Sequence, residues 1–189
     1  MNSKELFVRD TTVIKKSDNL FTAEVSDNWS IGNTANGGYS MTLAAKAMSE
    51  FLEHKDPLSI SAHYLDRVDF GATELHVTHL SSSKSLSTAR VELIQNNKIK
   101  IIFIGTFTDF SFKNDMNIYE RDVPSFPDYE SCEVIPYKEG FNPKLDKNIE
   151  KAYSQDSLWW KKDKENLSST LNLYMLSLIH ISEPTRHRL

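Results

Sequence analysis

Residues 29–52, WSIGNTANGGYSMTLAAKAMSEFL, constrain the fold more than any other stretch of this chain. A turn of Asn and Gly leads directly into a predicted helix with apolar residues on nearly every side, namely Met41, Leu43, Ala44, Ala45, Ala47, Met48, Phe51 and Leu52. Such a helix must be buried rather than lie on a surface. Four strand-like runs follow it, so we predict one long buried helix enclosed by a sheet.

The runs on either side of this helix predict the sheet. Residues 5–15 and 19–26 are rich in Phe, Val, Ile and Thr, and we expect them to form a hairpin that leads to the helix. Asp56-Pro57 ends the helical pattern, and residues 58–64 then alternate between apolar and polar side chains at strand period.

Three further strands are predicted around Leu75 and Val77, at residues 86–95 and at residues 99–110. Ala89, Val91 and Leu93 should share one face of the middle strand. Asn96-Asn97, a residue type that tolerates left-handed backbone, predicts a tight turn between the last two strands. All these turns are too short for crossovers, so the strands should be antiparallel. The order ββαββββ predicts an α+β domain, a curled antiparallel sheet wrapped around one helix.

Composition limits the class of protein. The chain has 189 residues, of which 39% are hydrophobic and 25% charged, with a net charge of −4, as in an ordinary globular protein. It has no basic patch, which argues against nucleic acid as a partner. Residues 1–10 are charged and no apolar run follows them, so we expect a cytoplasmic protein without a membrane span. Cys132 is the only cysteine, which leaves a reactive thiol open but excludes an internal disulfide.

The chain is predicted to have four parts. Residues 1–111 form the N-terminal domain, residues 112–147 a proline-punctuated connector, and residues 148–175 the start of a truncated second domain. Residues 176–189 are expected to be an artefactual tail, because LSLIHISEPTR at 176–186 resembles a reading frame through a sequencing-library adapter. Ser177 to Ile181 could alternatively form a short strand.

The start of the predicted helix is the main candidate site. Backbone N–H groups near Gly37 and Gly38 lack partners inside the helix and lie at its positive end, so they could hold a carbonyl oxygen. Two glycines also allow a ligand to approach the backbone closely. The alternative is that they let the helix pass under a neighbouring strand. Asn36 could cap the helix or orient a water.

Titratable candidates are few. His63 could face the groove beside the helix and contact a substrate, or it could be a solvent-facing strand histidine. Asp66 and Asp69 could supply a general base, although a role in the turn is the preferred interpretation. Histidines 54, 63, 76 and 79 include no pair at helical metal spacing, so neither a metal nor a cofactor is expected.

Basic and aromatic residues leave further alternatives open. Arg67, Lys84 and Arg90 could bind phosphate groups, or they could belong to solvated faces. Trp159-Trp160 is more typical of a core or an interface than of ligand stacking.

Two motif-like stretches lack the residues that their chemistry requires. Gly32 to Gly37 has the spacing of a phosphate-binding loop, but Gly38 and Tyr39 stand where Lys and Ser or Thr are needed. The stretch around Ser40 approximates a nucleophile elbow, but Thr42 replaces its last Gly.

Three motifs together resemble the N-terminal hotdog domain of TesB-like acyl-CoA thioesterases over about residues 5–110. They are Trp29 with Asn36-Gly37-Gly38-Tyr39, DPLSISAHYLDRV at 56–68, and KSLSTARVELIQ at 84–95. The resemblance implies a hotdog fold and an acyl-CoA substrate. The implied substrate-binding residues are Asn36, Gly37, Gly38, Tyr39 and His63.

Members of that family join two hotdog domains in one chain, and their catalytic Asp, Thr and Gln lie in the second. The resemblance therefore implies that no catalytic residue is assignable in this chain, and that the fragment by itself is inactive. It also implies self-association or pairing with a second hotdog domain. The alternative is a non-catalytic hotdog module that binds acyl groups or pairs with another subunit, because fold does not determine function.

Overall fold

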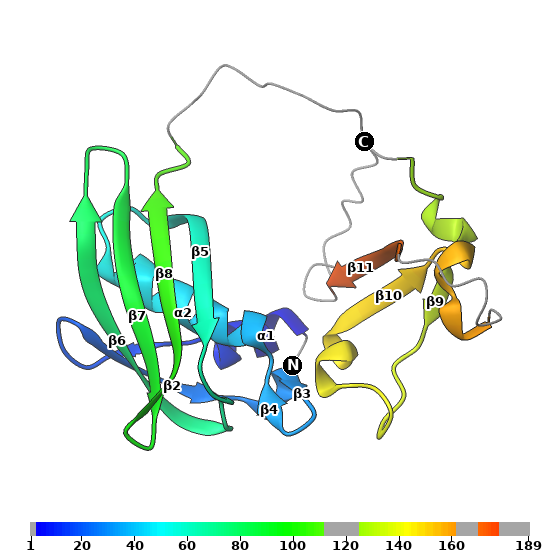
Figure 1. Ribbon diagram of the computed structural model, residues 1–189, viewed down its shortest axis with the longest axis horizontal. Helices are drawn as coiled ribbons and strands as arrows, with labels where there is room; N and C mark the ends of the chain where they lie inside the picture. Colours follow the sequence, from blue (N-terminus) through cyan, green and yellow to red (C-terminus); the bar gives the residue numbers. More distant parts are fainter. Residues whose placement is uncertain (1–2, 112–124, 162–169, 178–189) are drawn as a thin grey trace. The chain divides into compact units, whose positions relative to one another are not determined.

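The computed structural model describes residues 3–111, 125–161 and 170–177. The chain divides into two compact units, Glu5–Asp115 and Met116–Leu189, and the second unit also takes in residues 2–4. Each unit has its own sheet (Figure 1).

A six-stranded antiparallel sheet forms the first unit, in the order β1-β2-β6-β7-β8-β5. A separate two-stranded ribbon pairs β3 with β4, and a short 3-10 helix at Asp27–Trp29 precedes it. The elements are α1 (Ser3–Asp10), β1 (Ile14–Lys15), β2 (Leu20–Val25), β3 (Ser30–Ile31), β4 (Thr34–Ala35), α2 (Gly37–Phe51), β5 (Asp56–Tyr64), β6 (Gly71–Ser82), β7 (Ser87–Gln95) and β8 (Lys98–Thr108).

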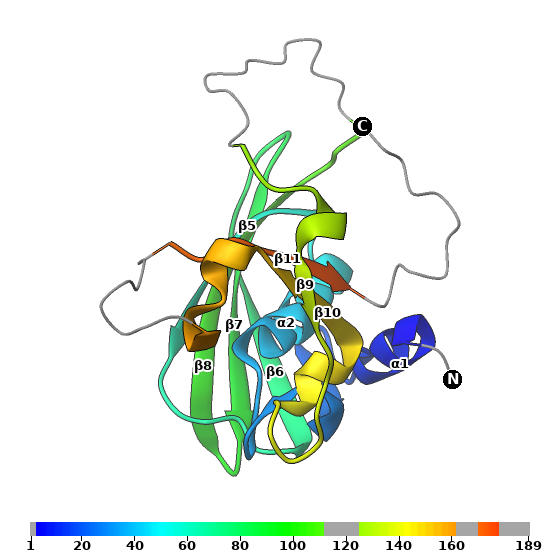
Figure 2. The same cartoon turned by 90° about the vertical axis from the view of Figure 1, so that its right-hand side faces the viewer.

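Helix α2 crosses one face of this sheet and contacts β2, β5, β6, β7 and β8 (Figures 1 and 2). Its core-facing residues recur at helical spacing, and those of the strands at period two. The fully buried side chains where helix and sheet meet include Leu43, Met48, Phe21, Leu75, Val77, Phe103 and Phe107. This burial of apolar area is the main stabilising contribution to the domain. The α+β fold with one helix against a curled antiparallel sheet is confirmed.

Two local predictions about β7 and its turn are also confirmed. Ala89, Val91 and Leu93 are all completely buried on the helix-facing side of β7. Asn96 and Asn97 have φ angles of 53° and 58°, so both lie in the left-handed region. A two-residue turn with both residues in this region matches the right-handed twist of the flanking strands, and Asn tolerates this backbone conformation better than most residues.

The predicted strand at residues 5–15 is wrong. Residues Ser3–Asp10 form helix α1, and only Ile14–Lys15 pair with β2. Tertiary contacts decide this segment: Phe7 packs edge-on against Trp29 at 5.1 Å, and the Thr11 hydroxyl donates to the Phe7 carbonyl at 2.7 Å. Packing and hydrogen bonds of this kind override weak strand propensity.

The expectation that α2 is buried on nearly every side is only partly right. Residues Ser40, Leu43, Ala44, Ala47 and Met48 are buried. Gly38, Lys46 and Glu50 lie on the other side and are exposed, with Thr42 and Ala45 partly so. Positions 38, 42, 46 and 50 recur every four residues, so one stripe of the helix is not covered by the sheet.

The second unit contains a three-stranded antiparallel sheet in the order β11-β10-β9. Its strands are β9 (Glu133–Ile135), β10 (Ile149–Tyr153) and β11 (Leu173–Ser177), with 3-10 helices at Tyr129–Ser131, Lys144–Asn148, Gln155–Ser157 and Trp159–Lys161. β9 lies in the range predicted as a connector. β11 includes Leu176 and Ser177, the first two residues of the predicted tail, and the rest of that tail lies outside the described residues.

Within the described ranges, no helix has both the length and the apolar character needed to cross a membrane.

Candidate functional site

Asn36 caps the start of α2. Its Oδ1 accepts hydrogen bonds from the backbone N–H groups of Gly38 at 2.9 Å and Tyr39 at 3.1 Å. This is the usual geometry of an N-cap residue, which satisfies donors that the helix cannot. The Gly38 amide is therefore occupied by the cap.

Gly37 lies directly under the last side chain of β5. A Cβ atom placed on Gly37 would lie 2.7 Å from the Tyr64 hydroxyl oxygen and 2.9 Å from two atoms of its ring. Glycine lets Tyr64 lie there, and a side chain at position 37 would displace the exposed end of the tyrosine. This contact matches the second interpretation of the glycine pair, in which the helix start passes under a neighbouring strand. Tyr64 is 55% exposed and was not predicted as a site residue, although its place on the helix-facing side of β5 follows from period two.

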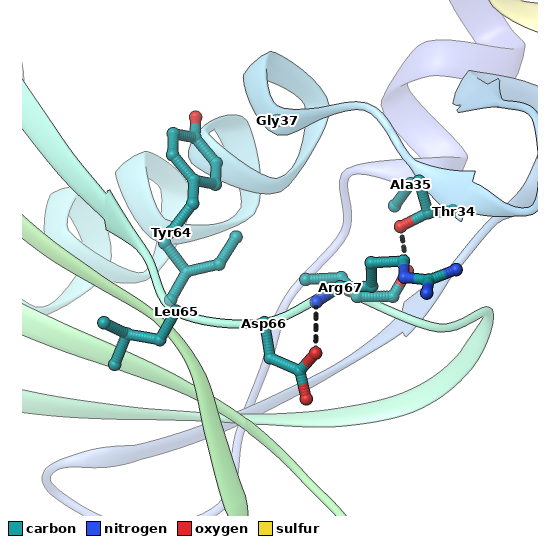
Figure 3. A pocket seen from close by; sticks show the side chains of 9 residues that line it. Thr34, Ala35, Gly37, Tyr64, Leu65, Asp66 and Arg67 are labelled. Carbon is teal, nitrogen blue, oxygen red and sulfur yellow. Dashed lines mark hydrogen bonds between the residues drawn. The ribbon is translucent and has the colours of Figure 1, made fainter.

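An open cavity of about 300 Å³ lies beside this contact. Its walls are largely apolar, and come from β4, the start of α2, the end of β5, β8 and the loop that follows β5 (Figure 3). The lining residues are Thr34, Ala35, Gly37, Tyr64, Leu65, Asp66, Arg67, Val68 and Ile101. The Thr34 hydroxyl donates to the Val68 carbonyl at 2.9 Å, which ties β4 to the loop and closes that side of the cavity.

Asp66 is held as an anion at the edge of this cavity. Its Oδ2 accepts hydrogen bonds from Lys98 Nζ at 2.8 Å and Lys100 Nζ at 3.1 Å, and its Oδ1 accepts one from the Arg67 backbone N–H at 2.8 Å. The hydrogen bond from Lys98, then those from Arg67 and Lys100, hold the pKa of Asp66 far below its usual value. A carboxylate with so low a proton affinity is a poor general base, so its observed role is to anchor the loop.

Asp69 and Gln95 complete the anchoring of this loop. Asp69 is 3.6 Å from the buried Lys100 Nζ, and its backbone N–H donates to Gln95 Oε1 at 2.9 Å. Gln95 Nε2 in turn donates to the Asp69 carbonyl at 2.8 Å. The preferred interpretation of Asp66 and Asp69 as turn residues agrees with these contacts.

Tyr39 lies inside the core rather than in the cavity. Its hydroxyl donates to the Asp10 carbonyl at 2.6 Å and accepts from the Ser26 backbone N–H at 3.1 Å. Its ring stacks on Trp29 at 6.0 Å. Burial raises the pKa of Tyr39. The hydroxyl thus connects α1 and the end of β2 to the helix.

The remaining candidates lie away from the cavity. His63 is exposed and, by strand period, points to the face of β5 opposite Tyr64. Arg90 pairs with Glu92 at 2.7 Å on the face of β7 away from the helix. Lys84 lies in the hairpin after β6, at the far end of that strand from Arg67. Ser40 is buried and its hydroxyl donates to the Asn36 carbonyl at 3.2 Å, so it has no nucleophile geometry.

Sequence reasoning also missed the buried Asp10, because the segment was predicted to be a strand. No group of His, Cys, Asp or Glu within residues 3–111, 125–161 and 170–177 is arranged to hold a metal ion.

Residues 25–108 match the family model of the acyl-CoA thioesterase N-terminal domain. Solved structures share the fold. A candidate thioesterase II from Thermobifida fusca YX has a TM-score of 0.70 at 19% identity, over 80% of this chain and 55% of that one. A protein described as having a hot dog fold, from Alicyclobacillus acidocaldarius, has a TM-score of 0.68 at 11% identity, over 78% and 55% of the two chains.

Acyl-CoA thioesterase II TesB2 from Mycobacterium marinum has a TM-score of 0.63 at 12% identity, over 93% of this chain and 64% of that one. The chain thus spans just over half the length of the first two structures. A comparison with curated protein sequences gives no match. At these identities the solved structures establish the fold alone, and the family model covers less than half of the chain. Residues 25–108 are therefore similar to an acyl-CoA thioesterase N-terminal domain, and the first unit has a hotdog fold.

Proposed function

We propose that this chain is the N-terminal half of a double-hotdog acyl-CoA thioesterase. The observation that carries the proposal is the match of residues 25–108 to the acyl-CoA thioesterase N-terminal domain. The reaction is hydrolysis: water adds to the thioester carbonyl carbon, the carbon–sulfur bond breaks, and a carboxylic acid and the coenzyme A thiol are released.

The cavity beside Gly37 suits the acyl side of such a substrate. Its apolar walls would bury a short hydrocarbon chain, and the positive end of α2 favours the charge that develops on the carbonyl oxygen. The Gly38 N–H already donates to Asn36 Oδ1 and does not bind the carbonyl oxygen. The start of α2 therefore contributes to the site through the electric field of the helix dipole and through the space beside Gly37, which has no side chain. Asn36, Gly37 and Gly38 therefore stay in the proposed site as elements that shape it.

Tyr39 and His63 remain proposed site residues on the resemblance alone. Tyr39 supports the helix start from inside the core, and His63 lies on the outer face of β5. A direct contact of either side chain with an acyl group in the cavity would need a different arrangement of these side chains.

Acyl-CoA hydrolysis by the 189-residue chain should be absent or very slow, because the family's catalytic Asp, Thr and Gln belong to a second domain. The test measures thiol release from acyl-CoA substrates with this chain and with the longer product of its source gene, sequenced beyond codon 175. A longer product should turn over at an ordinary enzymatic rate, roughly 1 to 1,000 per second.

Turnover of that size by the 189-residue chain, abolished by Gly38→Val, would contradict the proposal and place the catalytic groups in this half. A longer product that binds acyl-CoA without hydrolysing it would instead support the non-catalytic acyl-binding module.

The first unit should also self-associate, because β5 lies at the edge of the sheet and its outer side has no strand partner among the described residues. Leu58 lies within β5 and Leu65 directly follows it, and they are 55% and 59% exposed. An open sheet edge favours pairing with another strand. Sedimentation velocity at micromolar concentration should show dimers or larger species.

The double variant Leu58→Lys, Leu65→Lys should shift the population to monomer, since edge lysines oppose pairing. Leu80→Lys is the matched control, because Leu80 is 49% exposed but lies on β6 and not on β5. A wild-type chain that sediments as a monomer would count against pairing through β5.

A further inference from the structure

The cavity beside Gly37 combines apolar walls with the exposed, basic side chain of Arg67. Ala35, Leu65, Val68 and Ile101 supply the apolar surface. The Arg67 side chain reaches the same cavity and points away from the carboxylate of Asp66 (Figure 3). Among the described residues, its guanidinium makes no hydrogen bond and no ion pair.

The other charges around the cavity already balance one another. Lys98 and Lys100 both bind Asp66, and Lys100 also lies 3.6 Å from Asp69. These two cations and two anions cancel, and both oxygens of Asp66 accept hydrogen bonds from donors other than the Arg67 guanidinium. Among the described residues around the cavity, Arg67 therefore has the one charge that no other side chain pairs.

The other basic residues that could bind phosphate do not share this position. Arg90 is paired with Glu92 on the opposite face of the sheet, and Lys84 lies beyond the far end of β6. Arginine is suited to oxyanions because its planar guanidinium can donate two parallel hydrogen bonds to a carboxylate or phosphate.

We propose that Arg67 is the specificity-determining anion anchor of this cavity, and that it binds an oxyanion of the thioester ligand whose apolar part lies against the cavity walls. The oxyanion has two sources, a phosphate of coenzyme A or a carboxylate at the end of the acyl chain. The inference rests on the proposed function, which supplies the class of ligand, an acyl-CoA thioester. It adds that Arg67 selects among such thioesters by their oxyanion.

Binding of three ligands to the 189-residue chain tests this by isothermal titration: coenzyme A, hexanoyl-CoA and adipoyl-CoA. Arg67→Gln should weaken binding about tenfold or more, the usual size of a lost charge-assisted hydrogen bond. Arg67→Lys should restore part of the loss, since it keeps the charge but not the paired donors. Lys84→Gln removes the same charge elsewhere and should change the dissociation constant by less than about twofold.

The pattern of loss identifies the oxyanion. Equal weakening for all three ligands indicates a phosphate of coenzyme A, and weakening for adipoyl-CoA alone indicates the acyl carboxylate; both support the anchor. Because the exposed Arg67 guanidinium makes no hydrogen bond or ion pair with a described residue, Arg67→Gln should leave the thermal unfolding midpoint unchanged, which separates binding from folding.

Equal dissociation constants for the wild-type chain and Arg67→Gln would overturn the inference while leaving the proposed function intact. Absence of binding to the wild-type chain would overturn it as well. The proposed function is tested separately, by measuring acyl-CoA hydrolysis by the longer gene product.

Discussion

Gly105→Val should lower the free energy of unfolding of the first unit by about 3 kcal/mol or more, because it overpacks the centre of the core. A Cβ atom at Gly105 would lie 2.5 Å from Met48 Sδ and 3.1 Å from Phe107 Cε2. Met48 and Phe107 are both fully buried, so neither has free space to move into. A residue with a side chain is otherwise favoured over glycine in a strand, so the expected loss comes from packing alone.

Urea unfolding measures this effect in a Trp159→Phe, Trp160→Phe background, where the fluorescence reports Trp29 alone. Gly105→Ala should cost about 1 to 3 kcal/mol. The double variant Gly105→Ala, Met48→Ala should cost less than the sum of its single changes, because the shortened side chain makes room for the new methyl group. Additive costs would show that Met48 is not what excludes a side chain at position 105.

Asp10→Ala should cost about 2 to 3 kcal/mol, since it leaves buried donors without acceptors. The Asp10 carboxylate accepts from Asn28 Nδ2 at 2.9 Å, Trp29 Nε1 at 3.0 Å and Arg9 Nε at 2.7 Å. Trp29 is buried, so water cannot replace the lost acceptor for its indole N–H. Asp10→Asn should cost less, because the amide oxygen retains one acceptor.

The contribution of Asp10 should also depend on pH. Burial by itself raises the pKa of Asp10, but hydrogen bonds from Asn28, Arg9, Ser26 and Trp29 outweigh it and hold the pKa below the ordinary 3.8. The unfolded chain therefore takes up a proton first as the pH falls. The stabilisation is complete above the ordinary pKa and is lost as the pH falls through the lower native value.

Urea unfolding at about pH 7 and about pH 3 tests this dependence. The difference in stability between the wild-type chain and Asp10→Asn should shrink at the lower pH. Asp18→Asn is the control, because Asp18 is exposed in the turn before β2. A difference that stays constant between the two pH values would contradict a lowered pKa in the native state.

Local patterns predicted the parts of the fold that depend on neighbours in the chain. The period-two burial of β7, the left-handed Asn96-Asn97 turn and the capped start of α2 at Asn36 all follow from side-chain direction and backbone preference within a few residues. The place of β5 beside β8, at the sheet edge, had no such signal, because pairing partners are chosen by long-range packing.

The site shows the same division. Its glycines were visible in the sequence, but the reason for Gly37 was not, since Tyr64 comes to it from the end of another strand. Asp66 was a candidate base until Lys98 and Lys100 were seen to hold it as an anion. Arg67 was one basic residue among three, and only the fold shows that it lines the cavity and that no side chain in the described part of the chain pairs with it.

By itself, then, the sequence determined the elements: a long helix with a capped, glycine-rich start, and alternating strands joined by tight turns. Backbone conformation and side-chain periodicity act over a few residues, so they can be read from the chain. The tertiary structure decided that residues 3–10 form a helix, which face of α2 is uncovered, and which charges pair around the cavity. Those outcomes depend on burial and hydrogen bonding between residues far apart in the chain, where many pairings compete and only the packed whole selects one.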